Sequence, residues 1–324
     1  MPRTPRLEYE GAFYHVMNRG RARQAIFHGD AYYSSFYKTL EEAHQRFGVV
    51  VHAYCLMGNH YHLLLQTPHA NLSRAMRHIN GVYTQRYNKL RRSDGPLFRG
   101  RFKSIVVDAD AYLLQLSRYI HTNPMDMYRP LVNQLEDYPC SSYLAYINAV
   151  KPPKWLDRDL IYQMLGKRQR YSGYRNYVEQ GVDEDIRRFY SKGNVASVLG
   201  DKGFKERLVE RKDLIEEGLN AYGQLERPTP ESIIDAISGR FGVERERLIK
   251  PSAPRQSLQV RKFAMYACQR YCDMKLSEIA KFFQVKRSGS VGNAIHQVRV
   301  EIDTGDFPMS LDEVDGMFKS IIMS

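Results

Sequence analysis

The stretch VVVHAYCLMGNHYHLLLQT, residues 49–67, decides the fold of the first part of the chain. Both halves are rich in apolar, β-branched or aromatic residues, and the pair Gly58-Asn59 separates them. This pattern predicts a β-hairpin with a tight joint. Because side chains alternate along a strand, His60 and His62 share one face of the second strand, and Tyr61 points to the other face.

The segments around the hairpin complete an α+β pattern. FYHVMNRG (13–20) predicts a strand that ends in a basic turn, and residues 30–47 and 71–91 have apolar residues at helical spacing. Residues 95–107 predict a loop that leads into a strand, and residues 108–123 a helix that stops before Pro124. The order β-α-β-β-α-β, followed by a helix, predicts a ferredoxin-like (split β-α-β) domain over residues 1–150.

The rest of the chain is predicted to be helical. Residues 151–227 are interpreted as a helical extension and linker, and ERPTPES (226–232) has the prolines and capping residues of a domain joint. Residues 228–324 then form an all-α domain. Within it, LSEIAKFFQV (276–285), a short joint and a helix starting near Ser288 or Ser290 are typical of a helix-turn-helix. A generic helical core explains the same periodicity equally well.

The charge of the chain favours a polyanionic partner. The 324 residues carry a formal net charge of +12, with 48 Lys and Arg against 36 Asp and Glu. The excess is concentrated in residues 1–130 and 250–300. Nucleic acid is the commonest partner of such basic blocks. No apolar run approaches the roughly 20 residues of a membrane span, the N-terminus lacks the apolar core of a signal peptide, and the four cysteines lack CxxC spacing. We therefore expect a reduced, cytoplasmic protein without a membrane partner.

The two histidines are candidate metal ligands. The helix at 108–123 ends in RYIHTNP, where Tyr119 and Asn123 are four residues apart and lie on one face. His60, His62 and the amide oxygen of Asn123 would form a set suited to Mg²⁺ or Mn²⁺, with Tyr119 beside the ion. The alternative is a half-polar sheet face with hydrogen-bonded histidines and a tyrosine that is only a buried aromatic.

These residues resemble the single-tyrosine HUH nucleases and, more narrowly, the REP-associated tyrosine transposases of bacteria. The resemblance covers roughly residues 9–150 and includes FYHVMNRG, CLMGNHYHLLLQ, GPLFRGRFKS, LSRYIHTNP and YPCSSYLAY. It implies that His60, His62 and Asn123 are metal ligands and that Tyr119 is the nucleophile. It also implies a bacterial, nucleoid-associated protein acting on single-stranded hairpin DNA of repetitive extragenic palindromes. The chain departs from the family at the joint, MGNH, and after HTNP, where MDMYRP follows.

Basic residues near the predicted site suit single-stranded DNA. Seven lie between residues 86 and 103, with aromatic residues between them, and this pattern favours phosphate pairing and base stacking: Arg86, Lys89, Arg91, Arg92, Arg99, Arg101 and Lys103. A solvated helix end is the alternative. The predicted DNA contacts of this domain are Arg19, Arg99, Arg101 and Lys103.

The second basic block resembles the DNA-binding C-terminal domain of the replication initiator DnaA, over roughly residues 231–300. APRQ, AMYACQRY and LSEIAKFF carry the resemblance. It implies binding of double-stranded DNA, with predicted contacts at Arg255, Lys286, Arg287, Ser288, Ser290 and Asn293. The initiator has Asp-His-Thr-Thr where this chain has Arg287-Ser288-Gly289-Ser290, so recognition of the initiator's own DNA box is not implied.

The sequence thus favours a metal-dependent, single-strand DNA transesterase that works through a 5′-phosphotyrosine intermediate. The alternative from another class is a non-catalytic DNA-binding regulator or nucleoid protein with an inactive HUH site. A relaxase or replication-initiator nuclease of the same superfamily is a third reading, against which the adjoining motifs argue. The sequence makes no prediction of the oligomeric state.

Overall fold

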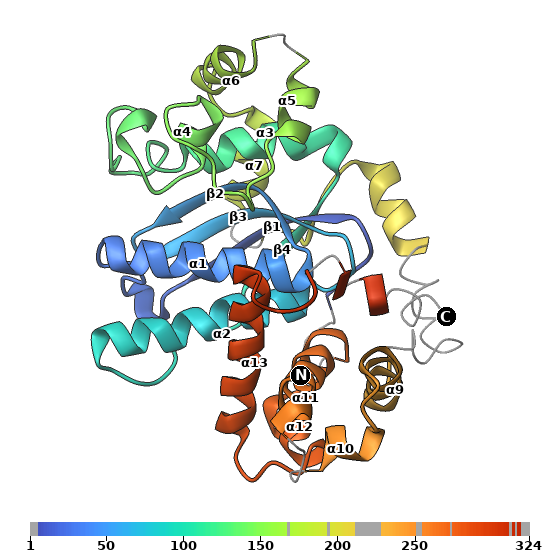
Figure 1. Cartoon of the computed structure of the whole chain (residues 1–324). Helices are drawn as coiled ribbons and strands as arrows, with labels where there is room; N and C mark the ends of the chain where they lie inside the picture. The colour runs from blue at the N-terminus through green and yellow to red at the C-terminus, as the bar shows by residue number, and fades with distance from the viewer. Residues whose placement is uncertain are drawn as a thin grey trace. The chain divides into compact units, whose positions relative to one another are not determined.

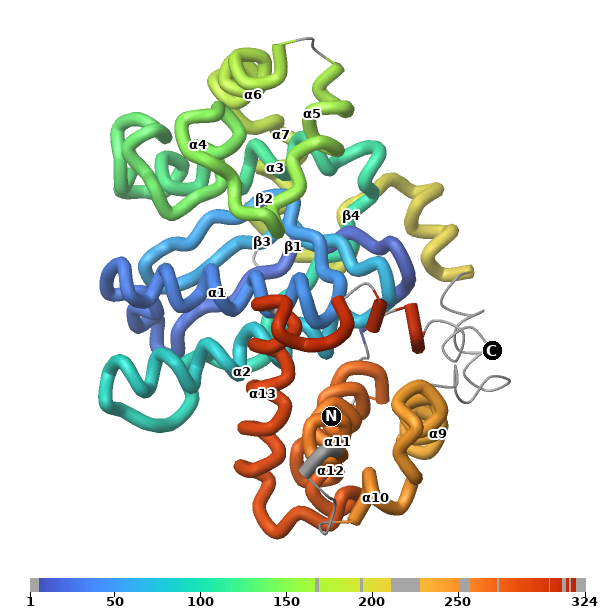
Figure 2. The backbone as a smooth tube through the Cα atoms, in the orientation of Figure 1, coloured from blue at the N-terminus to red at the C-terminus, as the bar shows by residue number. Residues whose placement is uncertain are grey.

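The computed structural model describes residues 6–166, 169–192, 195–210, 228–250, 255–272, 274–310, 313–314 and 316–318. The chain divides into two compact units, one up to residue 213 and the other from residue 214. Figures 1 and 2 show the course of the backbone through both. Each unit is described by itself below.

The first unit is built on a mixed sheet with the strand order β2-β3-β1-β4-β5. Its strands are β1 (Ala12–Arg19), β2 (Val50–Met57), β3 (His60–Thr67), β4 (Lys103–Val107) and β5 (Val198–Leu199). The pairs β2–β3, β3–β1 and β1–β4 are antiparallel, and β4–β5 is parallel. The order of the first four strands confirms the ferredoxin-like prediction. The sequence did not predict β5, which adds a parallel edge strand from the segment after residue 150.

Helices cover both faces of this sheet, as Figure 1 shows. On one face, α1 (Asp30–Phe47) and α2 (Leu72–Arg91) pack over Tyr14, Tyr61 and Leu63, which are fully buried. On the other face, α3 (Ala109–Thr122) packs over Cys55 and Leu64. Because strand side chains alternate, this division assigns odd-numbered residues of β3 to the first core and even-numbered residues to the second.

The segment after residue 150 packs onto α3 and belongs to the first unit. A 3₁₀ turn η1 (Arg21–Arg23) follows β1, and η2 (Leu135–Asp137), α4 (Tyr143–Tyr146), α5 (Asp159–Leu165), α6 (Arg170–Glu179) and α7 (Glu184–Ser191) follow α3. The guanidinium of Arg118 donates to the carbonyl of Tyr177 at 3.0 Å and pairs with Asp183, the N-cap residue of α7. The part of the predicted linker that the structure describes up to residue 210 is therefore folded against α3 and the sheet.

In the second unit the described residues form helices and their connections, as predicted. Its helices are α9 (Pro230–Phe241), α10 (Arg245–Ile249), α11 (Arg255–Tyr271), α12 (Leu276–Phe282) and α13 (Ser288–Thr304). Its core contains Ile237, Phe263, Ile279, Phe283 and Ile295, all nearly inaccessible to solvent.

The buried guanidinium of Arg261 connects three helices of this unit. The guanidinium of Arg261 in α11 donates to the carbonyls of Lys250 (2.8 Å), Ile249 (3.2 Å) and Phe283 (2.5 Å). These carbonyls end α10 and α12, so Arg261 ties both helices to α11. Burial lowers the pKa of Arg261, and the three carbonyls compensate for the lost hydration of the guanidinium.

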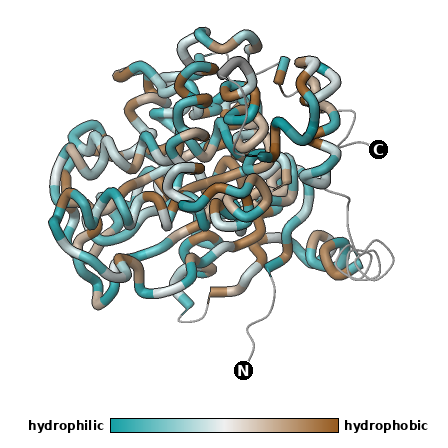
Figure 3. The backbone as a smooth tube through the Cα atoms, turned by 60° about the horizontal axis from the view of Figure 1, so that its bottom comes forward, coloured by the Kyte–Doolittle hydropathy of each residue, from teal (hydrophilic) through white to brown (hydrophobic). Residues whose placement is uncertain are grey.

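Helices such as α1 and α2 have one buried and one exposed face, whereas residues 263–268 of α11 are buried on all sides. Along the helices, hydrophilic and hydrophobic residues alternate (Figure 3). No helix in the described ranges is long and apolar enough to cross a membrane. All four cysteines are free.

An ion pair between α1 and α2 should make the first unit sensitive to acid. The guanidinium of Arg86 donates to Glu42 Oε1 at 2.6 Å and to Thr39 at 2.7 Å, and His78 lies 3.6 Å from Glu42 Oε2. Burial raises the pKa of Glu42, but its hydrogen bonds with His78 and Arg86 outweigh this and lower the pKa to about 2. Glu42→Gln should therefore cost about 1–2 kcal/mol of unfolding free energy at pH 7.

Proton linkage determines the direction in which pH changes the contribution of Glu42 to the unfolding free energy. The folded pKa is below the ordinary value of 4.5, so the contribution of Glu42 is present above pH 4.5 and is lost as the pH falls towards 2. Urea unfolding followed by the fluorescence of Trp155, the single tryptophan, reports on this unit. Glu41→Gln, at an exposed neighbouring carboxylate, is the control. An equal effect of both variants across the pH range would contradict the prediction.

Candidate functional site

The two histidines of β3 lie together on the face of the sheet that α3 covers. The rings of His60 and His62 have their centroids 5.1 Å apart at 76°. His60 Nδ1 donates to Asn59 Oδ1 at 2.7 Å, which leaves the lone pair on Nε2. His62 Nδ1 is 2.9 Å from His15 Nε2. Among the described residues, neither Nε2 makes a hydrogen bond.

Burial keeps these histidines neutral. It lowers the pKa of His60, and it lowers the pKa of His62 well below its usual value, with further contributions from the charges of His15 and His60. A neutral imidazole presents a lone pair, whereas an imidazolium would repel a cation. Both histidines are therefore in the form that a metal ligand requires.

Tyr119 of α3 faces the histidine pair. The centroid of its ring lies 6.2 Å from that of His62 and 6.0 Å from that of His15. The plane of the Tyr119 ring is nearly perpendicular to the planes of both imidazoles. The Tyr119 side chain is half-buried, and burial together with the charge of Asp126 raises its pKa to about 12. The phenol is thus protonated at neutral pH and needs assistance to act as a nucleophile.

Asn123 is connected to the site through Tyr119. Its Nδ2 donates to the carbonyl of Tyr119 at 2.7 Å, so the Oδ1 atom is left without a hydrogen bond in the described structure. Asn123 is the C-cap residue of α3. Among the described residues it makes no hydrogen bond with His60 or His62, so its link to the site is the hydrogen bond to the carbonyl of Tyr119.

His121, between the two, serves the opposite side of α3. It is fully buried, with Nδ1 2.7 Å from the hydroxyl of Tyr174 and Nε2 2.6 Å from Ser142 Oγ. Two residues of helix, about 200°, separate its direction from that of Tyr119. His121 is therefore a structural residue that links α3 to α4 and α6.

The donor set fits a divalent ion. Two imidazoles and one amide oxygen are ligands that Mg²⁺ and Mn²⁺ accept, and Nδ1 of each histidine contacts a second residue, as is usual for metal-binding histidines. When the proton of His62 is on Nδ1, the Nε2 atoms of both histidines carry a lone pair. No group of three or more His, Cys, Asp or Glu side chains with metal-binding geometry occurs within the described ranges. The His-His-Asn set contains only two residues of these four types and is therefore a different kind of ligand set.

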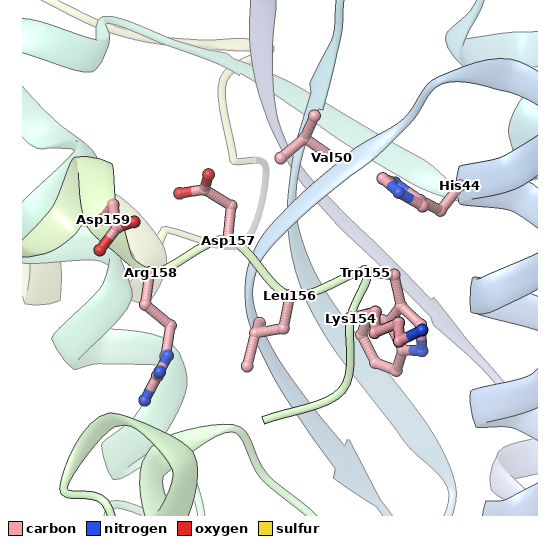
Figure 4. A pocket seen from close by; sticks show the side chains of 8 residues that line it. All are labelled: His44, Val50, Lys154, Trp155, Leu156, Asp157, Arg158 and Asp159. Atoms are coloured by element: carbon pink, nitrogen blue, oxygen red, sulfur yellow. The ribbon is translucent and has the colours of Figure 1, made fainter. Parts of the chain in front are cut away.

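A pocket of about 260 Å³ lies away from these residues (Figure 4). It is formed where residues 154–159 cross the start of β2, and Asp157 there donates its backbone N–H to the carbonyl of Val51 at 2.9 Å. Trp155 packs on Tyr54, with ring centroids 5.6 Å apart. None of the predicted site residues lines this pocket.

The predicted DNA contacts of the first unit gather at the end of the sheet that carries His60. Arg19 is paired with His60 in the register of β1 and β3, and the backbone N–H of Arg99 donates to the carbonyl of Arg19 at 3.0 Å. Lys103 is opposite Met17 in the β1–β4 pair, so it shares the face of His62. Arg99, Arg101 and Lys103 are exposed, and none of the three forms an ion pair within the part of the chain described.

Arg86, one of the seven basic residues of this region, has a different role. Its guanidinium is bound to Glu42 and Thr39 of α1. The expectation that all seven serve DNA is therefore wrong for Arg86, because a carboxylate of the protein already neutralises its charge.

In the second unit the predicted recognition helix α13 starts at Ser288, as expected. Lys286, Arg287, Ser288, Ser290 and Asn293 are all exposed at its N-terminal end. Gln284, in the turn before it, adopts a left-handed conformation with φ of 53°, which gives the turn its sharp change of direction. The side chain of Arg255, at the start of α11, lies outside the described residues.

The sequence reading missed two residues of the site, His15 and Tyr190. His15 is fully buried on β1, and Tyr190 of α7 lies with its hydroxyl 2.5 Å from His15 Nδ1. The alternation of FYHVMNRG could have revealed His15, because it shares a face with Met17 and Arg19. No sequence signal points to Tyr190, which comes from the extension after residue 150.

Fold and site together define a ferredoxin-like domain with a tyrosine facing a histidine pair, followed by a helix-turn-helix unit. Residues 8–123 match the family model described as "Transposase IS200 like", and residues 230–298 match "Bacterial dnaA protein helix-turn-helix". The first region is thus similar to the IS200-like transposases and the second to the DnaA-type helix-turn-helix domains. Both resemblances seen in the sequence are confirmed.

Two individual proteins are similar to parts of the chain. The chromosomal replication initiator protein DnaA of Bacteroides thetaiotaomicron is 23% identical over 147 residues, which is 44% of this chain and 31% of the initiator. The chain thus spans about a third of that relative's length. A solved structure of a REP-associated tyrosine transposase bound to a REP hairpin has a TM-score of 0.40 and 16% identity, covering 49% of this chain and 93% of that one.

Proposed function

We propose that the protein is a metal-dependent, single-strand DNA transesterase with Tyr119 as nucleophile. The observation that carries the proposal is the meeting of α3 and β3, where Tyr119 lies with its ring centroid 6.2 Å from that of His62. The match of residues 8–123 to the IS200-like transposases supports a DNA-processing role. His60, His62 and Asn123 would hold a Mg²⁺ or Mn²⁺ ion.

In the proposed reaction the hydroxyl oxygen of Tyr119 attacks a phosphodiester in line with the departing 3′ oxygen. The P–O3′ bond breaks, a Tyr119 Oη–P bond forms, the 5′ end of the strand is left as a phosphotyrosine, and a proton ends on the free 3′-OH. A divalent ion, when bound, neutralises charge on the scissile phosphate and orients it. Because the new ester is a phosphodiester like the old one, the reverse attack by a 3′-OH rejoins a strand without ATP.

Substrate binding is assigned to the cations at the same end of the sheet, of which Arg19 is half-buried and the other three are exposed. Arg19, Arg99, Arg101 and Lys103 would pair with phosphates. Phe98 and Phe102 are buried, so base stacking on them, expected from the sequence, is not part of the proposal. The preferred substrate is a single-stranded hairpin like those of repetitive extragenic palindromes. This substrate rests on the resemblance of the first domain to its family.

The second unit is proposed to bind double-stranded DNA through the N-terminal end of α13. The exposed Lys286 and Arg287 would contact phosphates, and Ser288, Ser290 and Asn293 would approach base edges. A DNA-binding regulator with an inactive site would share this property, so only the chemistry at Tyr119 separates the two functions. We further propose that the protein acts in the bacterial cytoplasm, at the nucleoid.

Removal of the Tyr119 hydroxyl should abolish the covalent intermediate. Tyr119→Phe deletes one oxygen and keeps the ring, so folding and DNA binding should persist while adduct and cleavage vanish. The measurement is a denaturing gel of protein incubated with a labelled single-stranded hairpin library and Mn²⁺. Tyr112→Phe on the same helix is the control. An adduct formed by Tyr119→Phe refutes the assignment, and no adduct from the wild type favours the regulator.

Removal of the ion or its ligands should have the same effect. His60→Ala, His62→Ala and treatment of the wild type with EDTA should each reduce cleavage by at least about 100-fold, because charge on the phosphate is no longer neutralised. His28→Ala, outside the site, should cleave normally. Undiminished cleavage in EDTA would sink the metal-dependent mechanism.

Duplex binding should depend on the cations before α13. Replacing Lys286 and Arg287 by Gln should weaken duplex binding and reduce the slope of log K against log salt by up to about 1.8, if both contact phosphates. Fluorescence anisotropy at several salt concentrations measures the slope. Arg247→Gln with Lys250→Gln removes the same charge from α10, where both residues pair with glutamates, and should change the slope much less. Equal slopes for the two double variants would contradict the helix-turn-helix assignment.

A further inference from the structure

Behind His62 a row of hydrogen-bonded side chains leads away from the proposed ion site. His62 Nδ1 is 2.9 Å from His15 Nε2, and His15 Nδ1 is 2.5 Å from the hydroxyl of Tyr190. The rings of His15 and His62 are stacked with centroids 5.1 Å apart. His15 is fully buried and His62 is nearly so, whereas Tyr190 of α7 is half-buried.

Tyr190 also contacts the proposed nucleophile. Its ring lies parallel to that of Tyr119, with the centroids 4.3 Å apart and an angle of 9° between the planes. Tyr190 is thus in contact with both parts of the site, the histidine row through its hydroxyl and Tyr119 through its ring. The position of α7 itself is set by Arg118, which pairs with Asp183, and by the buried Ile186.

The row has two consistent arrangements of protons. In one, His62 Nδ1–H donates to His15 Nε2, and His15 Nδ1–H donates to the Tyr190 oxygen. In the other, Tyr190 donates to His15 and His15 donates to His62, which places the remaining proton of His62 on Nε2. Only the first arrangement leaves a lone pair on His62 Nε2, the atom that faces no other hydrogen-bond partner in the described structure.

We propose that His15 and Tyr190 are positioning residues that hold His62 in its metal-binding tautomer and hold the ring of Tyr119 against the site. This inference rests on the proposed function, because it concerns the same ion and the same nucleophile. It assigns a role to the extension after residue 150: α7 completes the site from outside the ferredoxin-like fold. His15 Nε2 accepts the hydrogen bond that His62 Nδ1–H donates, and His15 touches no reacting atom.

A comparison of three full-length variants tests the role of His15. His15→Phe keeps a ring in the core and removes both nitrogens, so it should weaken Mn²⁺ binding by about 10–100-fold. His15→Gln supplies an amide oxygen that can accept from His62 Nδ1, so it should restore most of the affinity. Tyr190→Phe keeps the ring on Tyr119 and loses the hydroxyl, so it should weaken Mn²⁺ binding less than His15→Phe. The readout is isothermal titration of each protein with Mn²⁺, with thermal unfolding to confirm folding.

The role of Tyr190 as a support for Tyr119 has a separate readout. At Mn²⁺ concentrations that saturate each protein, Tyr190→Leu should form the covalent adduct more slowly than Tyr190→Phe, because only the latter keeps the stacked ring. The tautomer of His62 can be observed directly. In the Mg²⁺-loaded wild type, ¹⁵N NMR of the histidine side chains should find the proton of His62 on Nδ1.

The outcomes separate this inference from the proposed function. Equal Mn²⁺ affinity of folded His15→Phe and the wild type overturns the inference while the ion site stands. A His62 proton on Nε2 in the Mg²⁺-loaded protein overturns it as well. Failure of the wild type to bind Mn²⁺ overturns the ion site, and the inference with it. Loss of affinity in His15→Phe that His15→Gln restores supports it, since a residue that only filled space would give no such rescue.

Discussion

The strict alternation of side chains along β3 is the constraint on which the rest of the first unit depends. Tyr61, Leu63 and Leu65 enter the core under α1 and α2, whereas His60, His62 and Leu64 face α3. A shift of the register by one residue would drive both histidines into an apolar core and bring Tyr61 and its hydroxyl to the α3 side. Hydrogen bonds on both neighbours, β1 and β2, hold the strand. The positions of His60 and His62 are therefore fixed by the hydrogen bonds of a central strand of the sheet.

The central position of β3 also bears on why residues outside the ferredoxin-like fold contribute to the site. A sheet face that carries histidines must be covered by an element with polar groups of its own, and α3 is such an element. Its buried Arg118, Ser117 and His121 find partners in Asp183, Tyr174 and Ser142, all of which come from later segments. Each of these groups would be costly to bury alone. Two of the three partners, Asp183 and Tyr174, belong to the extension after residue 150, which therefore stabilises α3 and through it positions Tyr119.

The sequence predicted what depends on local periodicity. The strands, the long helices, the joint at Gly58-Asn59 and the shared face of His60 and His62 follow from alternation and helical spacing, and the structure confirms them. It missed what depends on contacts between distant segments. Tyr190 meets His15 across 175 residues of chain, and β5 has only two residues, too few for a periodic signal. Arg86 was misread for the same reason, because its partner Glu42 lies on another helix.

The ligand charges and the pKa values around the proposed ion site bear on what the ion would do there. The proposed ligands His60, His62 and Asn123 are neutral, so a divalent ion held by them would keep its full charge for the phosphate, where carboxylate ligands would cancel part of it. Burial serves this end, because it keeps the histidines unprotonated. It also raises the pKa of Tyr119, as does the charge of Asp126, and this opposes formation of the nucleophile. A nearby cation favours the phenolate and acts against both effects. In the proposed mechanism, a site of this composition would be inactive without its ion, and the ion would supply both charge neutralisation at the phosphate and a lower pKa of Tyr119.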